Sequence, residues 1–147
     1  MEIKDILSPG CTQCAAEDSS KKRILETIAN IAHRALPQFS SDDILESLLN
    51  REKVGSTGIG NGIALPHGRL NDLDKVVGVL ITCQSPISFD AIDNKPVDIF
   101  FALLVPAEQA QGHLQTLATI AGKLNDKDVL KKLRQAETNH DLYEAII

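Results

Sequence analysis

Aromatic side chains and a surplus of positive charge are both missing from this sequence of 147 residues. It has no tryptophan, aromatic residues make up 3% of the chain, and the formal net charge at pH 7 is −5. Proteins that bind nucleic acids typically carry a basic excess and aromatic side chains that stack on bases, which argues against a nucleic-acid partner. With so few aromatics, the hydrophobic core is expected to consist of isoleucine, leucine, valine and alanine.

Long apolar runs are also absent from the sequence. No stretch approaches the roughly 20 residues that a membrane-spanning helix needs. The N-terminus, MEIKDILSPG, lacks the basic and then apolar layout of a signal peptide. We therefore expect a cytoplasmic protein with no membrane insertion. Residues 1–147 are expected to form a single domain, which at this length buries roughly 70% of its unfolded surface.

Cysteine is scarce, but two of the three cysteines, Cys11 and Cys14, form a C-x-x-C pair. In a reducing compartment this spacing is typical of redox and zinc sites. A redox pair of the thioredoxin type lies at a strand-to-helix turn, whereas CTQC precedes AAEDSSKKR. A zinc site needs two further ligands, and the sequence offers neither a second C-x-x-C nor an H-x-H. The favoured interpretation is a coincidental pair in a strand or turn, with no metal bound.

Hydrophobic periodicity predicts helices at both ends of the chain and strands between them. Helices are expected over residues 20–36, 40–53, 113–126, 126–136 and 139–147. Strands are expected near residues 11–14, in a segment ending at Leu65, and over residues 75–83, 87–89 and 97–105. This order favours an α/β (α+β) fold with three α/β/α layers and a mixed sheet of about five strands. Two helices precede the main group of strands and three follow it.

The stretch GSTGIGNGIALPHGR, residues 55–69, contains five of the nine glycines and presents His67. Ordering glycine costs conformational entropy, so such a cluster indicates tight turns or close backbone approach. Two interpretations are open: a hairpin with a tight turn, or a cradle of N–H groups around an anion that His67 handles. Pro66 disfavours helix at Leu65, so a strand is expected to end there and to leave His67 in a turn. An accessible imidazole suits nucleophilic or acid/base chemistry, whereas without a function it would be an ordinary loop histidine.

Other phosphate-binding and catalytic motifs do not fit the sequence. Gly58, Gly60 and Gly62 follow the pattern G-x-G-x-G rather than the dinucleotide-binding G-x-G-x-x-G, and no helix follows directly. There is no G-K-[ST] of a P-loop and no G-x-S-x-G nucleophile elbow. Paired carboxylates occur at a predicted helix start and in a predicted turn, where capping explains them.

The segments REKVGSTGIGNGIALPHGR and FDAIDNKPVDIFFALLVPAEQAQGHLQTLA resemble enzyme IIA domains of the bacterial phosphoenolpyruvate-dependent phosphotransferase system. The wider group is the mannitol and fructose type, and the nitrogen-regulatory branch is the best match. The resemblance covers about Leu7 to Ile147 and implies a single type-2 IIA domain. It implies that His67, in the P-H-G motif, accepts the phosphoryl group on Nε2, and that Arg51 and His113 complete the site. Sugar-type members often carry an acidic residue where this sequence, like the nitrogen-regulatory branch, has Asn61.

The resemblance implies a phosphotransferase that acts as a histidine phosphoryl carrier, with regulatory rather than metabolic turnover. Phosphoryl transfer depends mainly on positioning and on stabilising charge on the phosphoryl oxygens. Arg51 can bind these oxygens as a fork, and His113 can donate a hydrogen bond near the start of a helix. Backbone N–H groups around Gly68 are expected to complete the phosphate site. The remaining loop candidates are Ser56, Thr57 and Asn61. No metal and no cofactor are expected.

The implied phosphoryl donor is an HPr-like phosphocarrier of the nitrogen branch. The implied targets are regulated cytoplasmic proteins, such as kinases or transport regulators, that distinguish the two phosphorylation states. We expect a monomer or a weak dimer. The alternative function is a sugar-specific, fructose/mannitol-type IIA component that passes phosphate to a transporter IIB domain. The sequence carries no transporter domain, which favours regulation. A histidine-dependent hydrolase is a third possibility, but no convincing nucleophile or metal partner accompanies His67.

Overall fold

A computed structural model describes residues 2–108 and 113–147 of the chain. Two short 3-10 helices, η1 (Ile3–Asp5) and η2 (Pro9–Cys11), come first. The strands are β1 (Thr12–Ala16), β2 (Gly58–Gly60), β3 (Ile63–Ala64), β4 (His67–Leu70), β5 (Val77–Ile87) and β6 (Val97–Pro106). The α-helices are α1 (Lys21–Ala35), α2 (Ser41–Glu52), α3 (Leu114–Leu124), α4 (Lys127–Gln135) and α5 (Asn139–Ile146). The expected order of a short strand, two helices, a group of strands and three helices is confirmed.

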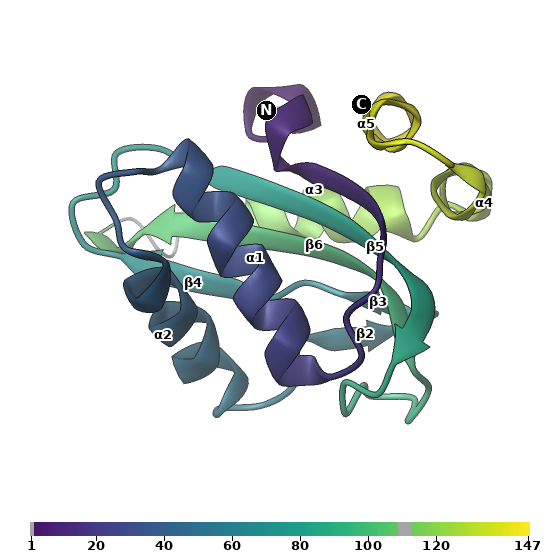
Figure 1. Ribbon diagram of the computed structural model, residues 1–147, viewed down its shortest axis with the longest axis horizontal. Helices are drawn as coiled ribbons and strands as arrows, with labels where there is room; N and C mark the ends of the chain where they lie inside the picture. The colour runs from purple at the N-terminus through teal and green to yellow at the C-terminus, as the bar shows by residue number, and fades with distance from the viewer. Residues whose placement is uncertain (1, 109–112) are drawn as a thin grey trace.

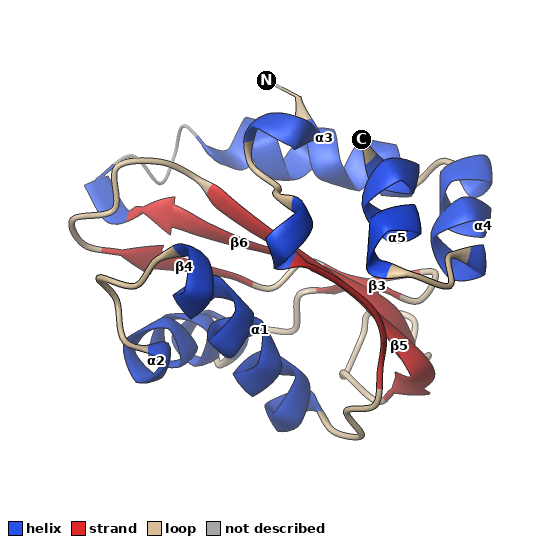
Figure 2. Ribbon diagram, turned by 45° about the horizontal axis from the view of Figure 1, so that its top comes forward, coloured by secondary structure: helices blue, strands red, loops and turns tan. Residues whose placement is uncertain are grey.

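The described strands form one mixed sheet with helices on both faces. The strand order is β1-β5-β6-β3-β2, and β4 also pairs with β6. β5 and β6 are antiparallel, whereas β1 joins β5 in parallel, and β3 and β4 join β6 in parallel. Figure 1 traces the chain, and Figure 2 shows α1 and α2 on one side of the sheet with α3, α4 and α5 on the other. The predicted α/β class with a mixed sheet is therefore confirmed, with six strands in place of about five.

β6 lies in the middle of the sheet and supplies much of the core. Nine of its ten residues are buried because helices cover both faces. The core consists mainly of isoleucine, leucine, valine and alanine, as expected from the composition. Three of the four phenylalanines, Phe89, Phe100 and Phe101, are also fully buried there. Among the described residues, no helix is both long and apolar enough to cross a membrane.

β3 and β4 both pair with β6 in the same register. Ile63 lies opposite Ile99 and His67 lies opposite Leu103, so the offset between the strands is the same before and after Pro66. Pro66 has no N–H to donate, but its carbonyl still accepts a hydrogen bond of 2.9 Å from the Leu103 N–H. The expectation of a turn at His67 is therefore wrong: His67 begins a strand. Proline interrupts the pairing only locally, as edge strands tolerate.

The expectation of a separate strand over residues 87–89 is also wrong. They belong in part to β5, which continues from Val77 to Ile87 with a shift in register between Thr82 and Ile87.

The starts of α1 and α2, at Lys21 and Ser41, lie one residue from the expected positions. The side chain of Ser20 caps α1 by accepting the Arg23 N–H, and that of Ser40 caps α2 by accepting the Asp43 N–H.

Candidate functional site

Helix α2 and strand β4 bring Arg51 and His67 together. The Nε atom of Arg51 donates a hydrogen bond of 3.2 Å to Nε2 of His67. This approach depends on Gly68, because a Cβ atom at that position would lie 2.9 Å from the backbone carbonyl carbon of Ser47 on α2. Any larger residue would push α2 away from β4. Gly68 therefore has a packing role, and its backbone lies within the pairing of β4 with β6.

The hydrogen bonds of His67 determine which ring nitrogen carries the proton. An arginine guanidinium only donates, so Nε2 must accept from Arg51 with its lone pair. Nδ1 lies 2.9 Å from the carbonyl oxygen of Leu65, which only accepts, so Nδ1 must carry the proton. The two contacts together assign the tautomer with an unprotonated Nε2, and this is the nucleophilic atom of the ring.

The surroundings of His67 favour the neutral imidazole. Burial lowers the pKa of His67 below its ordinary value of about 6.5. The hydrogen bond to the Leu65 carbonyl raises the pKa and Arg51 lowers it. The smaller opposing effects of Glu52 and Arg69 follow, and the net direction is downward. The ring is therefore neutral at pH 7, with its Nε2 lone pair available.

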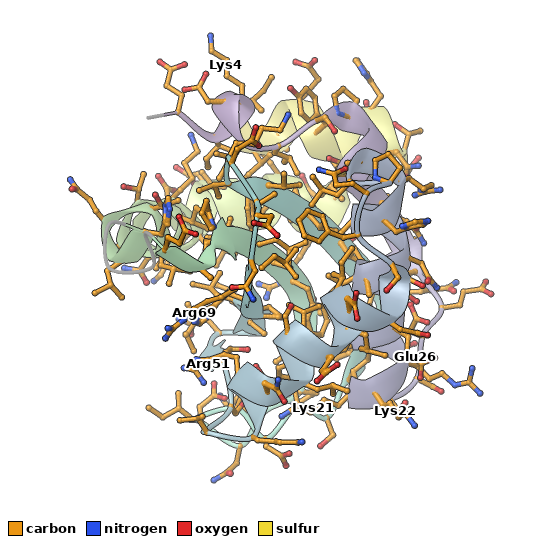
Figure 3. All side chains as sticks on the ribbon, turned by 90° about the vertical axis from the view of Figure 1, so that its left-hand side faces the viewer. Lys4, Lys21, Lys22, Glu26, Arg51 and Arg69 are labelled. Atoms are coloured by element: carbon orange, nitrogen blue, oxygen red, sulfur yellow. The ribbon has the colours of Figure 1, made fainter. Side chains whose placement is uncertain are left out.

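Arg51 is held from a second direction by the loop that follows α2. Its Nη1 atom donates a hydrogen bond of 2.8 Å to the carbonyl oxygen of Gly55. Arg69 adds a further positive charge, because residues two apart in a strand point to the same face and Arg69 is two residues beyond His67. Figure 3 shows Arg51 and Arg69 on the same side of the molecule. Two guanidinium groups near a neutral nucleophile form a site suited to an anionic, electrophilic group.

Arg69 was not among the residues expected to form the site. Its exposed side chain touches His67 through no hydrogen bond among the described residues, and it acts on the imidazole through its charge. The signal was present in the sequence as the spacing H-x-R. It becomes informative only once residues 67–70 are known to form a strand rather than a turn.

His113 lies directly before α3, where it occupies the N-cap position. Its Nε2 atom is buried and has no hydrogen-bond partner among the residues that the structure describes. No described contact joins it to His67 or Arg51. Residues 109–112, which lead into His113, lie outside the described residues. Gly68 faces α2, and α3 lies on the other side of the sheet from α2 (Figure 2).

The hydroxyl groups of Ser56 and Thr57 are both used to hold the loop after α2. Ser56 donates to the carbonyl of Phe89 at 2.8 Å and accepts the Gly58 N–H at 3.1 Å. Thr57 donates both its hydroxyl and its N–H to the carboxylate of Glu52. These two residues therefore follow Arg51 by five and six positions in the chain, but their hydroxyl groups are bonded to protein groups.

The structure does not bring Asn61 to His67. Asn61 lies in the turn between β2 and β3, six residues before His67, which along a strand corresponds to roughly 20 Å. Its N–H donates to Asp93 at 3.2 Å, and its carbonyl accepts from Arg134 at 2.6 Å. Gly60 and Gly62 on either side have φ angles of 98° and 79°, which glycine adopts readily. Of the two interpretations of the glycine cluster, the structure contains the hairpin.

Within residues 2–108 and 113–147, no group of three or more His, Cys, Asp or Glu side chains is arranged to hold a metal ion. Cys11, in η2, is buried, and Cys14, in β1, is partly buried. The Sγ atom of Cys14 donates to the carbonyl of Ala136 at 3.0 Å. Two strands, β5 and β6, separate β1 from β4, so the cysteine pair lies across the sheet from His67.

Comparison with known proteins gives consistent matches over almost the whole chain. A family model described as "Phosphoenolpyruvate-dependent sugar phosphotransferase system, EIIA 2" matches residues 5–147. The nitrogen regulatory protein of Klebsiella oxytoca is 48% identical over 147 residues, which covers 99% of this chain and 90% of that protein. The nitrogen regulatory protein of Escherichia coli strain K12 is 46% identical with the same coverage.

Solved structures agree with these matches. The crystal structure of the nitrogen regulatory protein IIA-Ntr from Neisseria meningitidis has a TM-score of 0.91 and 35% identity, covering 99% of both chains. The crystal structure of IIA mannitol from Escherichia coli has a TM-score of 0.78 at 16% identity, covering 95% of this chain and 98% of that one. At that identity the second match supports the fold alone.

Proposed function

Because the chain belongs to the EIIA 2 family of the phosphoenolpyruvate-dependent sugar phosphotransferase system, we propose that His67 accepts a phosphoryl group from an HPr-like phosphocarrier. The observation that carries the proposal is the unprotonated Nε2 atom of His67, which faces the Arg51 guanidinium at 3.2 Å. A neutral nucleophile beside a fixed cation is the arrangement that attack on a phosphoryl group requires.

In the proposed step the lone pair of His67 Nε2 attacks the phosphorus atom of the phosphorylated carrier. A P–N bond to Nε2 forms, and the bond between phosphorus and the carrier breaks, with its electron pair returning to the carrier. The proton on Nδ1 stays in place, because that atom donates to the Leu65 carbonyl before and after transfer. This hydrogen bond also stabilises the positive charge that develops on the ring as Nε2 bonds to phosphorus.

Arg51 has to exchange partners during this step. Its hydrogen bond to Nε2 occupies the atom that attacks, so the guanidinium moves from the ring nitrogen to the phosphoryl oxygens. Phosphoryl oxygens carry negative charge and can accept two parallel bonds from a guanidinium, whereas the ring nitrogen is a single neutral acceptor, which favours the exchange. The Gly55 carbonyl keeps the guanidinium near the site. In the proposal His113 supplies a second donor and Arg69 a further positive charge.

The regulatory part of the proposal concerns proteins that recognise the unphosphorylated chain. Phosphorylation adds nearly two negative charges to a site that is otherwise neutral at its nucleophile. Two exposed apolar residues adjoin site residues in the chain: Val54 is 83% exposed and Leu114 is 65% exposed. A partner that packs on these side chains around neutral His67 would meet a buried charge after phosphorylation. Coupling of the usual size, about 1–3 kcal/mol, changes affinity by about 5- to 150-fold.

Reconstituted transfer tests the first part of the proposal. The chain is mixed with phosphoenolpyruvate, enzyme I and the HPr-like carrier, and intact mass is followed for one acid-labile phosphoryl group. His67→Gln is expected to remain unlabelled, and His113→Ala is expected to be labelled more slowly. Undiminished labelling of His67→Gln would place the acceptor elsewhere, and a wild-type rate for His113→Ala would remove that residue from the site.

A comparison of bound partners tests the regulatory part. Phosphorylated and unphosphorylated chains are used side by side as bait in cell extract, and the phosphocarrier is left out when the bound proteins are compared. The proposal predicts at least one protein that binds the unphosphorylated chain preferentially. Identical partner sets, together with transfer of phosphate onward to a sugar-specific IIB domain, would favour the sugar-transport alternative.

A further inference from the structure

Glu52 is a nearly buried carboxylate in an unfavourable place. It is the last residue of α2, where the partial negative charge of the helix end repels an acidic side chain. Its side chain is 5% exposed, so its charge is also largely removed from water. A carboxylate under both penalties needs strong partners and indicates a role that an apolar residue would not fulfil.

The partners of Glu52 come from two other parts of the chain. Lys21, the first residue of α1, places its Nζ atom 3.0 Å from Oε1. The same ammonium group lies 4.5 Å from the centre of the Phe89 ring and 3.8 Å from the exposed carboxylate of Asp90. Thr57 donates its N–H to Oε1 at 3.2 Å and its hydroxyl to Oε2. Glu52 therefore ties the loop after α2 to the starts of two elements, α1 and β2.

Thr57 connects Glu52 and Lys21 to the groups that bind both nitrogens of the His67 ring. The Thr57 carbonyl accepts the Leu65 N–H at 3.0 Å, and the Leu65 carbonyl in turn accepts from Nδ1 of His67. On the other side, the loop that Thr57 ends contains Gly55, whose carbonyl holds Arg51 against Nε2. The hydrogen-bond partners of both ring nitrogens thus depend on a segment that Glu52 fixes.

We propose that Glu52 is a positioning residue, which by holding Thr57 sets the places of the Gly55 carbonyl and the Leu65 peptide and thereby of Arg51 and the imidazole. The part that concerns transfer rests on the proposed function of His67. The positioning itself is a property of the unphosphorylated chain and is measurable without any carrier. Glu52 makes no described contact with the imidazole. Beyond the effect of its charge on the pKa of His67, it acts through Thr57 on the partners of Arg51 and Leu65.

The test has to separate positioning from stability, because removing Glu52 alone would leave the partly buried Lys21 ammonium and the Thr57 hydroxyl without this carboxylate and destabilise the fold. The double variant Lys21→Met/Glu52→Leu replaces the ion pair with apolar groups of similar size, which is often neutral or stabilising. Asp98→Leu/Arg134→Met is the matched control, since it removes a paired contact of 3.0 Å between β6 and α4. Thr57→Val removes the hydroxyl alone, and Thr57→Ser retains it.

Two measurements are made on each variant. The first is the rate of labelling from the phosphorylated carrier, in which the Lys21/Glu52 double variant is expected to lose up to about 10²-fold, the cost of a displaced catalytic group. Thr57→Val is expected to be slower than Thr57→Ser. The second is the nitrogen chemical shifts of the His67 ring and of Arg51 Nε in the unphosphorylated chain, which are expected to change in the Lys21/Glu52 variant and not in the control.

A wild-type rate with unchanged ring and Arg51 signals in the Lys21/Glu52 and Thr57→Val variants would overturn the proposal. Equal losses in the Asp98/Arg134 control would also overturn it, because they would trace the effect to stability. If the unaltered chain accepts no phosphoryl group, the proposed function fails. The chemical shifts then decide the positioning role independently. If the double variant does not fold, the comparison of Thr57→Val with Thr57→Ser decides.

Discussion

Arg51 and His67 are joined through the unprotonated ring nitrogen of the histidine, Nε2. The Arg51 Nε donates to His67 Nε2 at 3.2 Å, while His67 Nδ1 donates to the Leu65 carbonyl at 2.9 Å. The bond to Leu65 fixes the proton on Nδ1, and the bond from Arg51 occupies the lone pair of Nε2. The arginine is thus a partner of the resting imidazole and, in our proposal, becomes a partner of the phosphoryl oxygens.

Replacement of Arg51 tests this dual role. Arg51→Ala is expected to slow labelling by about 10²-fold or more, because a preorganised donor to the phosphoryl oxygens is lost. Arg51→Lys is expected to recover only part of the rate, since an ammonium group cannot form the planar fork. Rapid-quench labelling with the phosphorylated carrier measures both. Arg69→Ala is the control: it removes a nearby charge without a direct contact, and an equal loss there would argue for charge alone.

The pKa of His67 predicts how transfer depends on pH. Burial first, and then Arg51, lower this pKa below about 6.5. Protonation removes the Nε2 lone pair, so labelling is expected to slow as the pH falls through this pKa, at a lower pH than for a histidine of ordinary pKa. The free energy of unfolding is also expected to fall as the pH is lowered below about 6.5, because His67 binds a proton more readily in the unfolded chain than in the folded chain. An NMR titration of His67 with a midpoint at or above 6.5 would contradict this.

Gly68 is predicted not to tolerate a side chain, because α2 packs directly on it. Gly68→Ala would place a Cβ atom 2.9 Å from the Ser47 backbone, and a loss of about 1–3 kcal/mol in the free energy of unfolding is expected. Gly122 is the matched control, because it lies inside α3 with open space around its Cβ position. Gly122→Ala is expected to gain about 0.5–1 kcal/mol. Urea unfolding of both variants gives the comparison, and equal changes would refute the packing role of Gly68.

The cysteine pair is predicted to be irrelevant to transfer. β5 and β6 lie between β1 and β4, and three strand spacings correspond to about 14 Å. Cys11→Ser/Cys14→Ser is therefore expected to be labelled at the wild-type rate, with lower stability because Cys11 is 2% exposed. Parallel labelling and thermal unfolding measure the two effects. A large loss of labelling would restore a redox or zinc role.

The helices were predictable from the sequence because their signals are local. Apolar residues recur at helical spacing, and Ser20 and Ser40 cap α1 and α2 through their own side chains. The pairing of Arg51 with His67 was also foreseeable, because α2 ends directly before the glycine-rich segment. The resemblance of that segment to a known family supplied the roles that spacing alone does not specify.

Strand β4 was not predictable from local signals. Pro66 is a strong local signal against regular structure, and of the four residues that follow it, His67 to Leu70, only Leu70 is apolar. Pairing with β6 over residues 67–70 overrides that signal, and this long-range contact has no trace in the neighbouring residues. The same error hid Arg69, whose position beside His67 follows from the alternation of a strand. The burial of Glu52 likewise depends on Lys21 and Thr57, which come from separate segments.

Phosphorylation of His67 at Nε2 can be observed directly by NMR. The chain is labelled with ¹⁵N in its histidine rings, phosphorylated through the carrier, and examined by NMR for coupling between phosphorus and nitrogen. We expect a single phosphoryl group coupled to Nε2 of His67, with Nδ1 still protonated and bonded to the Leu65 carbonyl. Coupling to Nδ1, coupling to another of the four histidines, or no transfer from the phosphorylated carrier would contradict it.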